Sequence, residues 1–287
     1  MDTADKDIRF LDNLIYSLKG IDGVSAVVLG GSRSRGTHHS GSDFDIGLYY
    51  DPECPPDLNQ LQTWAKYQDD RKKDSLLTAF GEWGPWINGG GWLKVKSLPV
   101  DILYRDLNRV NDAVQDCLNG KVTISYQPGH PHGFVNSIYL AEIATCSILY
   151  DRAGTLSHLK GKVEPYPSSL KECTISKFLW EAEFSVTCAK KGLPYYDGSY
   201  IAGCFFRAIS CLNQVLFAVN ERFWTNEKGA VRMVSSFEIC PTPYEKKVNR
   251  IFSRLEPGRK QLNSSVKLLM ELIEETQALV KHDPNKF

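Results

Sequence analysis

The chain has 287 residues, of which 42% are hydrophobic, enough to bury a core and sufficient for two domains. Its 34 basic and 34 acidic residues balance, so the basic excess typical of proteins that bind polymeric nucleic acid is absent. The charged sequence MDTADKDIRF predicts no secretory signal, and the apolar runs fall short of the roughly 20 residues that a membrane helix needs.

The first half of the chain mixes helix and strand patterns. Apolar residues at positions 8, 11, 14, 15 and 18 predict one face of a helix that ends at Gly20. In chain order we then expect strands over 25–30 and 44–50, a helix over 57–80, a loop over 81–91, a strand over 93–105 broken near Pro99, a helix over 106–120 and a short strand over 121–127.

The second half is predicted to be helical. Helical patterns cover 134–150, 168–191, 199–223, 242–255 and 260–281. The change near residue 130 predicts an α+β fold: a small mixed-sheet domain over 1–130, then a helical bundle over 131–287 that binds the substrate. We expect the site in the cleft between the two.

Acidic residues interrupt two of the predicted strands. Side chains alternate along a strand, so Asp43 and Asp45 share one face and repel each other unless a cation lies between them. Asp101 lies on the opposite face of its strand from Val100 and Ile102 and is the candidate third carboxylate. Such oxygen ligands suit Mg²⁺, and three carboxylates beside a phosphate site predict phosphoryl chemistry with two metal ions.

A glycine turn lies between the strand at 25–30 and a predicted helix start. Gly30 and Gly31 allow the backbone to approach a ligand closely, Ser32 adds a hydroxyl, and the N–H groups of a helix start favour an anion. The turn lacks the Lys-Ser/Thr of a P-loop and does not fit GxGxxG, so alone it predicts only phosphate binding.

The stretch GGSRSRGTHHSGSDFDI, residues 30–46, resembles the signature of the DNA polymerase β-like minimal nucleotidyltransferases. Within that superfamily it is most similar to the antibiotic nucleotidyltransferases of the kanamycin, streptomycin and lincosamide types. The shared pattern is Gly31-Ser32, then Asp43-x-Asp45, then Asp101 on a later strand. The resemblance covers about the first 105 residues, and the second half resembles the helical bundles of those enzymes only in texture.

The resemblance implies an NTP co-substrate with two Mg²⁺ ions, held by Asp43, Asp45 and Asp101. It also implies a nucleotide-binding set, in which Arg35 matches a basic position of some members; the candidates are Gly31, Ser32, Arg35 and Ser42.

Glu142 lies in an apolar helical stripe, where a carboxylate is costly unless it is paired or used. In enzymes of the kanamycin type a helical glutamate of the second domain is the general base, and Glu142 is a candidate for that role beside Asp101. The alternative is a buried ion pair with Arg207, and Glu181 and Glu183 are weaker candidates for the base.

Tryptophans are frequent near the predicted loop. Trp83, Trp86 and Trp92 are candidates to cover an acceptor site, with core packing as the alternative.

The predicted function is Mg²⁺-dependent transfer of a nucleoside monophosphate from an NTP to a hydroxyl of a small molecule, possibly an antibiotic, with release of pyrophosphate. The alternatives are a protein-adenylylating enzyme of the antitoxin type and a non-catalytic nucleotide sensor on the same fold. Eight scattered cysteines without a CxxC pair predict reduced thiols, no zinc site and a cytoplasmic location. The expected partners are an NTP and a small acceptor, with no polymeric nucleic acid and no membrane.

Overall fold

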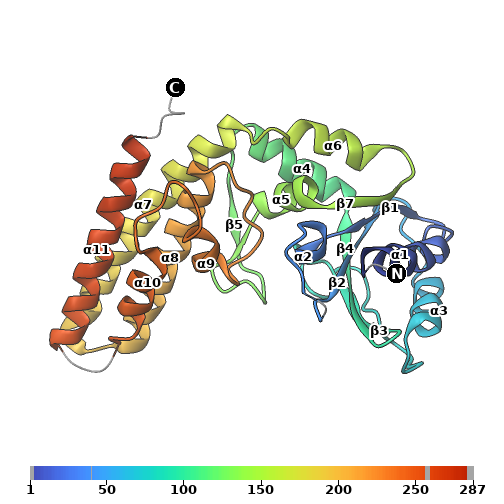
Figure 1. Cartoon of the computed structure of the whole chain (residues 1–287), viewed down its shortest axis with the longest axis horizontal. Helices are drawn as coiled ribbons and strands as arrows, with labels where there is room; N and C mark the ends of the chain where they lie inside the picture. Colours follow the sequence, from blue (N-terminus) through green and yellow to red (C-terminus); the bar gives the residue numbers. More distant parts are fainter. Residues whose placement is uncertain (1–2, 40, 256–258, 283–287) are drawn as a thin grey trace. The chain divides into compact units, whose positions relative to one another are not determined.

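The computed structural model describes residues 3–39, 41–255 and 259–282 (Figure 1). The chain forms two compact units and passes between them more than once. The sheet unit contains 1–115, 126–129 and 139–165, and the helical unit contains 116–125, 130–138 and 166–287. The segment 139–165, which the sequence placed after a single boundary near 130, thus groups with the sheet unit.

The sheet unit is built on five strands in the order β3-β4-β2-β1-β7 (Figure 1). Their bounds are Val24–Leu29 (β1), Phe44–Tyr50 (β2), Gly90–Val95 (β3), Leu98–Asp106 (β4) and Ser147–Asp151 (β7). Strands β2 and β4 run parallel, whereas the pairs β1–β2, β1–β7 and β3–β4 are antiparallel. The predicted α+β class with a mixed sheet, followed by a helical region, is confirmed.

The core of this unit lies on one face of the sheet. Phe44, Ile46 and Leu48 alternate along β2 and are fully buried on that face. They pack with apolar residues of α1 (Thr3–Leu18) and α3 (Leu58–Gln68), such as Leu14 and Trp64. The intervening residues of β2, beginning with Asp45, therefore face the other side of the sheet.

The other helices described before residue 165 are α2 (Gly31–Ser34), α4 (Leu107–Leu118), α5 (Ser137–Thr145) and α6 (Thr155–Val163). Helix α5 lies against the face opposite the core, because its Tyr139 ring lies 5.5 Å from the guanidinium of Arg105 on β4.

The helical unit contains α7 (Ser168–Gly192), α8 (Gly198–Val219), α9 (Ala230–Val234), α10 (Tyr244–Phe252), α11 (Arg259–Lys281), a 3₁₀ turn (Leu193–Tyr195) and the hairpin β5 (Ile124–Ser125) and β6 (Phe134–Val135). Helices α7 and α8 pack along each other, and α10 and α11 pack against this pair (Figure 1). In the described part of the chain, α8 alone is long and apolar enough to cross a membrane by length and composition. Most of it is buried inside the unit, as in the core helices of many proteins.

Three predicted elements differ from the structure. The helix expected over 57–80 ends at Gln68, and the broken strand expected over 93–105 is an antiparallel hairpin of β3 and β4. The helix expected over 134–150 is the short strand β6, then α5, then the edge strand β7.

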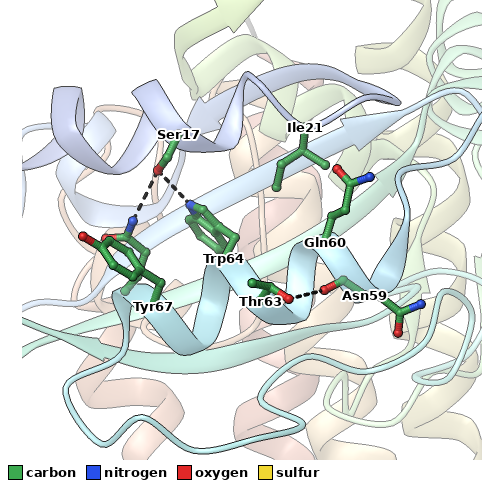
Figure 2. A pocket seen from close by; sticks show the side chains of 8 residues that line it. Ser17, Ile21, Asn59, Gln60, Thr63, Trp64 and Tyr67 are labelled. Carbon is green, nitrogen blue, oxygen red and sulfur yellow. Dashed lines mark hydrogen bonds between the residues drawn. The ribbon is translucent and has the colours of Figure 1, made fainter.

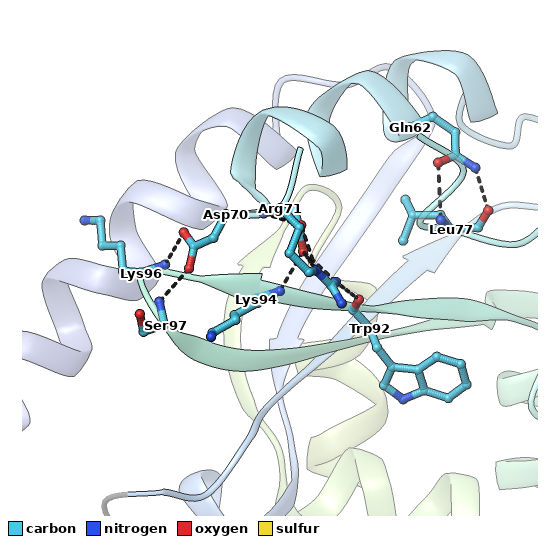
Figure 3. A network of polar contacts seen from close by, with 9 residues as sticks. Gln62, Asp70, Arg71, Leu77, Trp92, Lys94, Lys96 and Ser97 are labelled. Atoms are coloured by element: carbon cyan, nitrogen blue, oxygen red, sulfur yellow. Dashed lines mark hydrogen bonds and ion pairs between the residues drawn. The ribbon is translucent and has the colours of Figure 1, made fainter. Parts of the chain in front are cut away.

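A polar network explains the first two differences (Figure 3). The buried carboxylate of Asp69 accepts hydrogen bonds from the Arg71 side chain at 2.7–3.1 Å and from the backbone N–H of Lys94 at 2.8 Å. The bonds from Arg71, more than offsetting burial, lower the pKa of Asp69 to about 2. Asp70 accepts from the N–H groups of Lys96 and Ser97 at 3.0 and 2.7 Å. These bonds stop the helix and stabilise the hairpin turn.

Candidate active site

Asp45 and Asp101 lie side by side on adjacent parallel strands. Asp45 of β2 is in register with Asp101 of β4, and both are half-buried on the face opposite the core. Asp43 comes directly before β2 and is exposed. Burial, and next the negative charges of Asp45 and Asp43, raise the pKa of Asp101 to about 6. The structure therefore brings the three predicted carboxylates into one electrostatic group.

The carboxylates suit a hard divalent cation, although they are not a finished binding site. Among the described residues, no three His, Cys, Asp or Glu side chains converge closely enough to be a ready set of ligands. A bound cation would neutralise the negative charges of Asp45 and Asp43, which add to burial in raising the pKa of Asp101. Oxygen ligands on neighbouring strands, with the remaining positions left to water and phosphate, fit Mg²⁺.

The glycine turn packs directly on Asp45. Gly30 donates its N–H to the backbone oxygen of Asp45 at 2.7 Å. Gly31 has a φ of +64°, and a Cβ at this position would lie 1.7 Å from Oδ2 of Asp45. Glycine is thus required here because the Asp45 carboxylate occupies the space of a side chain. The sequence predicted a glycine for close approach of a phosphate, so this contact within the chain was missed.

The helix start after the turn is shorter than predicted. Helix α2 has only four residues, so its dipole contributes less than that of a long helix. Ser32 uses its backbone oxygen to accept from the N–H of Thr37 at 3.0 Å. Arg35 caps the end of α2 and is exposed. The hydroxyl of Ser42 accepts from the N–H of His39 at 3.0 Å, within the loop before Asp43.

Arg33, which the sequence analysis did not single out, joins the turn to the start of β2. Its Nε and Nη2 donate to the backbone oxygen of Ser42 at 3.1 and 2.9 Å, and Nε also reaches the oxygen of Asp43 at 3.2 Å. Its guanidinium lies 3.7 Å from the centre of the Phe44 ring. Arg33 therefore positions the segment that carries Asp43. The sequence gives no signal that distinguishes this structural role of Arg33 from the nucleotide-binding role expected of Arg35 two residues later.

Glu142 is paired with an arginine of the sheet. Its two carboxylate oxygens accept from Nε and Nη2 of Arg105, each at 2.7 Å. The Arg105 side chain is 3% exposed, and its attraction to Glu142 outweighs burial and raises its pKa further. Arg105 follows Asp101 by four residues on β4, which is roughly 13 Å along a strand. The structure thus does not bring Glu142 into the carboxylate group.

The ion pair predicted between Glu142 and Arg207 is wrong. Arg207 belongs to the helical unit and donates to Glu181 at 2.5 Å. Glu183, the other weaker candidate for a base, accepts a hydrogen bond from Gln277. Glu181 and Glu183 of α7 are therefore both engaged within the helical unit.

A separate groove of about 480 Å³ lies between α1 and α3 (Figure 2). Ser17 accepts hydrogen bonds there from the Trp64 indole at 3.1 Å and the Gln68 amide at 3.2 Å. The exposed ring of Tyr67 also lines it. Because α1 and α3 cover the core face, this groove lies on the opposite side of the sheet from Asp45 and Asp101.

Comparison with known proteins bears on the sheet unit through one family model. Residues 11–85 match the model of a nucleotidyltransferase domain, and residues 134–228 match a domain of unknown function. A crystal structure of a nucleotidyltransferase-like protein from Exiguobacterium sibiricum 255-15 is similar, with 8% identity and a TM-score of 0.42. That alignment covers 95% of this chain and 76% of the other. A search of curated proteins found no match. The match over residues 11–85 supports nucleotidyl transfer in general, and a domain of this kind implies an NTP substrate.

Proposed function

We propose that the chain is a cytoplasmic, Mg²⁺-dependent enzyme that transfers a nucleoside monophosphate from an NTP to a hydroxyl group of a small molecule. The observation that carries the proposal is the register of Asp45 with Asp101 beside the glycine turn, within a chain whose residues 11–85 match the model of a nucleotidyltransferase domain.

Each residue of the site has a proposed role. Asp43, Asp45 and Asp101 hold the ions, two in number, and the turn at Gly31 and Ser32 binds the triphosphate, aided by the exposed Arg35. Ser42 shapes the loop that borders the nucleotide. Bound Mg²⁺ supplies charge neutralisation for the phosphates and for the transition state.

The reaction is an in-line displacement at the α-phosphorus. The acceptor oxygen forms a bond to that phosphorus, and the bond to the oxygen that bridges the α- and β-phosphates breaks. Pyrophosphate leaves with the electron pair. We assign the hydroxyl proton to a carboxylate oxygen of Asp101, because this carboxylate lies beside Asp45 on the adjacent strand, within the group that would hold the reacting phosphate. Glu142 then serves as a structural partner of Arg105.

The proposal is tested with the four α-labelled NTPs, Mg²⁺ and a panel of hydroxyl compounds that includes antibiotics. Transfer is read as a mass increase of one nucleoside monophosphate with matching release of pyrophosphate. Asp45→Asn and Asp101→Asn should fold normally and lose transfer, because each removes a carboxylate of the metal site. Near-normal turnover in either variant would contradict the assignment, and labelling of a protein in place of a small molecule would favour the protein-modifying alternative.

A further inference from the structure

Trp92 extends the row of carboxylates by one strand. In the antiparallel hairpin of β3 and β4, Trp92 is directly opposite Asp101, which is in register with Asp45 on β2. Directly opposed residues share a face, and the next pair in register, Leu93 and Val100, is buried in the core on the other face. Neighbouring strands are about 4.8 Å apart, so Trp92 lies roughly 10 Å from Asp45 across the sheet.

The indole of Trp92 is an exposed surface beside the acids. Trp92 is 63% exposed, although tryptophan usually packs in the core. Arg71 donates to the backbone oxygen of Trp92 at 2.7 Å. Figure 3 shows the indole pointing away from the side of the sheet on which Asp70 and Arg71 lie.

A second tryptophan braces the first. The rings of Trp83 and Trp92 are in contact, with centres 4.7 Å apart and planes tilted by 30°. The loop that carries Trp83 is fixed, because Gln127 donates to the Trp83 backbone oxygen at 2.7 Å and the Asn88 side chain donates to the Tyr50 hydroxyl at 2.7 Å. One face of Trp92 is therefore covered by a held ring, and the surface is built before any ligand binds.

The order of strands separates the Trp92 surface from the glycine turn at Gly30 and Gly31. The turn follows β1 and packs on Asp45, whereas Trp92 lies on β3, at the other end of the row β3-β4-β2-β1. In an in-line displacement the attacking and leaving oxygens lie on opposite sides of the phosphorus. With pyrophosphate at the turn and the α-phosphate at Asp45 and Asp101, the acceptor hydroxyl must approach from the side of Trp92.

We propose that Trp92, braced by Trp83, binds the acceptor by stacking, and that the acceptor carries its reacting hydroxyl on a ring with an apolar face, as in a sugar or an aromatic compound. This inference rests on the proposed function and deepens it. The face of an indole binds flat ring surfaces, and stacking of one ring on an aromatic side chain changes affinity roughly 10- to 100-fold.

The test varies nucleotide and acceptor separately in the transfer assay. Trp92→Ala should raise the KM for a ring-bearing acceptor from the panel roughly 10- to 100-fold and leave the KM for the nucleotide within about 2-fold. The matched control is Tyr67→Ala, which removes an exposed ring on the opposite side of the same sheet and should change neither. A rise in nucleotide KM alone, or no change in either constant, would overturn the inference.

A second measurement needs no acceptor. Acrylamide quenching of Trp92 is obtained as the difference between the wild type and Trp92→Phe, with and without Mg²⁺ and α,β-methylene-ATP. If the nucleotide binds and Trp92 stays equally accessible, the acceptor side is supported. Protection of Trp92 by the bound nucleotide would place the nucleobase there and refute the inference. Failure of any nucleoside triphosphate analogue to bind would instead remove the proposed function, and the inference with it.

Discussion

Replacing Gly31 by alanine would place a methyl group where the carboxylate of Asp45 lies. The new Cβ would be 1.7 Å from Oδ2 and 2.6 Å from Cγ, whereas ordinary contact begins near 3.4 Å. The carboxylate must rotate or shift by more than an ångström, because the turn is tied to β2 by the hydrogen bond from Gly30. The variant therefore moves a predicted metal ligand without changing its chemistry.

Two costs can be separated by a matched control. A non-glycine residue at the φ of +64° of Gly31 costs about 1–2 kcal/mol of stability. Gly36 has a φ of +67°, and no heavy atom of the described chain lies within 4 Å of its Cβ position. Gly36→Ala therefore carries the same backbone cost and leaves Asp45 in place.

The assay is Mn²⁺ binding followed by electron paramagnetic resonance, with Mn²⁺ as the probe for the Mg²⁺ site. Disturbing the residues that orient a metal ligand typically weakens metal binding about 10- to 100-fold. We expect this loss of Mn²⁺ affinity in Gly31→Ala but not in Gly36→Ala. Gly36→Ala should lose only the backbone cost in stability, and Gly31→Ala should lose more, because it adds the clash with Asp45. Wild-type Mn²⁺ affinity in Gly31→Ala, or an equal loss in Gly36→Ala, would refute the reasoning.

Three further predictions concern titratable and charged side chains. The pKa of Asp101 is raised to about 6 from an ordinary 3.8, so without metal the sheet unit should lose stability as the pH rises from about 4 through 6. In EDTA, Asp101→Asn should abolish this fall in melting temperature, and a fall that persists in the variant would contradict the prediction. Glu142→Gln leaves the charge of the buried Arg105 poorly compensated and should lower the free energy of urea unfolding by about 3–5 kcal/mol. In the control Glu181→Gln the partner Arg207 is half-exposed, so the loss should be less than about 1 kcal/mol. Similar losses in the two variants would argue against the buried pair. Burial lowers the pKa of His132 to about 4, so on acidification the unfolded chain is protonated before the folded one. The helical unit should therefore lose about 3 kcal/mol of stability as the pH falls from 6.5 to 4. His132→Gln should flatten this dependence of stability on pH, and an unchanged dependence would assign it to other groups.

For the sheet unit, the sequence predicts which residues share a face of a strand better than it predicts which strands pair with each other. Strand alternation predicted one face for Asp43 and Asp45, and in the structure Asp45 lies opposite the buried Phe44 and Ile46, because burial of one face fixes the register. That Asp101 would be in register with Asp45 could not be derived, since the pairing of β2 with β4 is a contact between residues 56 positions apart in the chain.

The missed turn and strand have physical reasons too. Lys96 and Ser97 both have positive φ values, of 50° and 67°, which is the geometry of a two-residue hairpin turn. Neither is glycine or asparagine, so no turn signal was visible, and Asp70 supplies the stabilising hydrogen bonds from a distant loop. Periodicity alone predicts the residues of β7 as the end of a helix, because a short apolar run fits either element.

The ion pair of Glu142 connects these long-range contacts to the candidate site. Arg105, held by both oxygens of Glu142, also donates through Nη1 to the backbone oxygen of Ile87 at 3.2 Å. Ile87 lies in the loop that carries Trp83, so the pair fixes α5, β4 and this loop in one arrangement. A carboxylate that was selected from the sequence as a base thus affects the site by positioning the wall beside it. Because a positioning role acts through the loop, Glu142→Gln should change the acceptor KM together with stability, while loss of a base would lower kcat in a protein of normal stability.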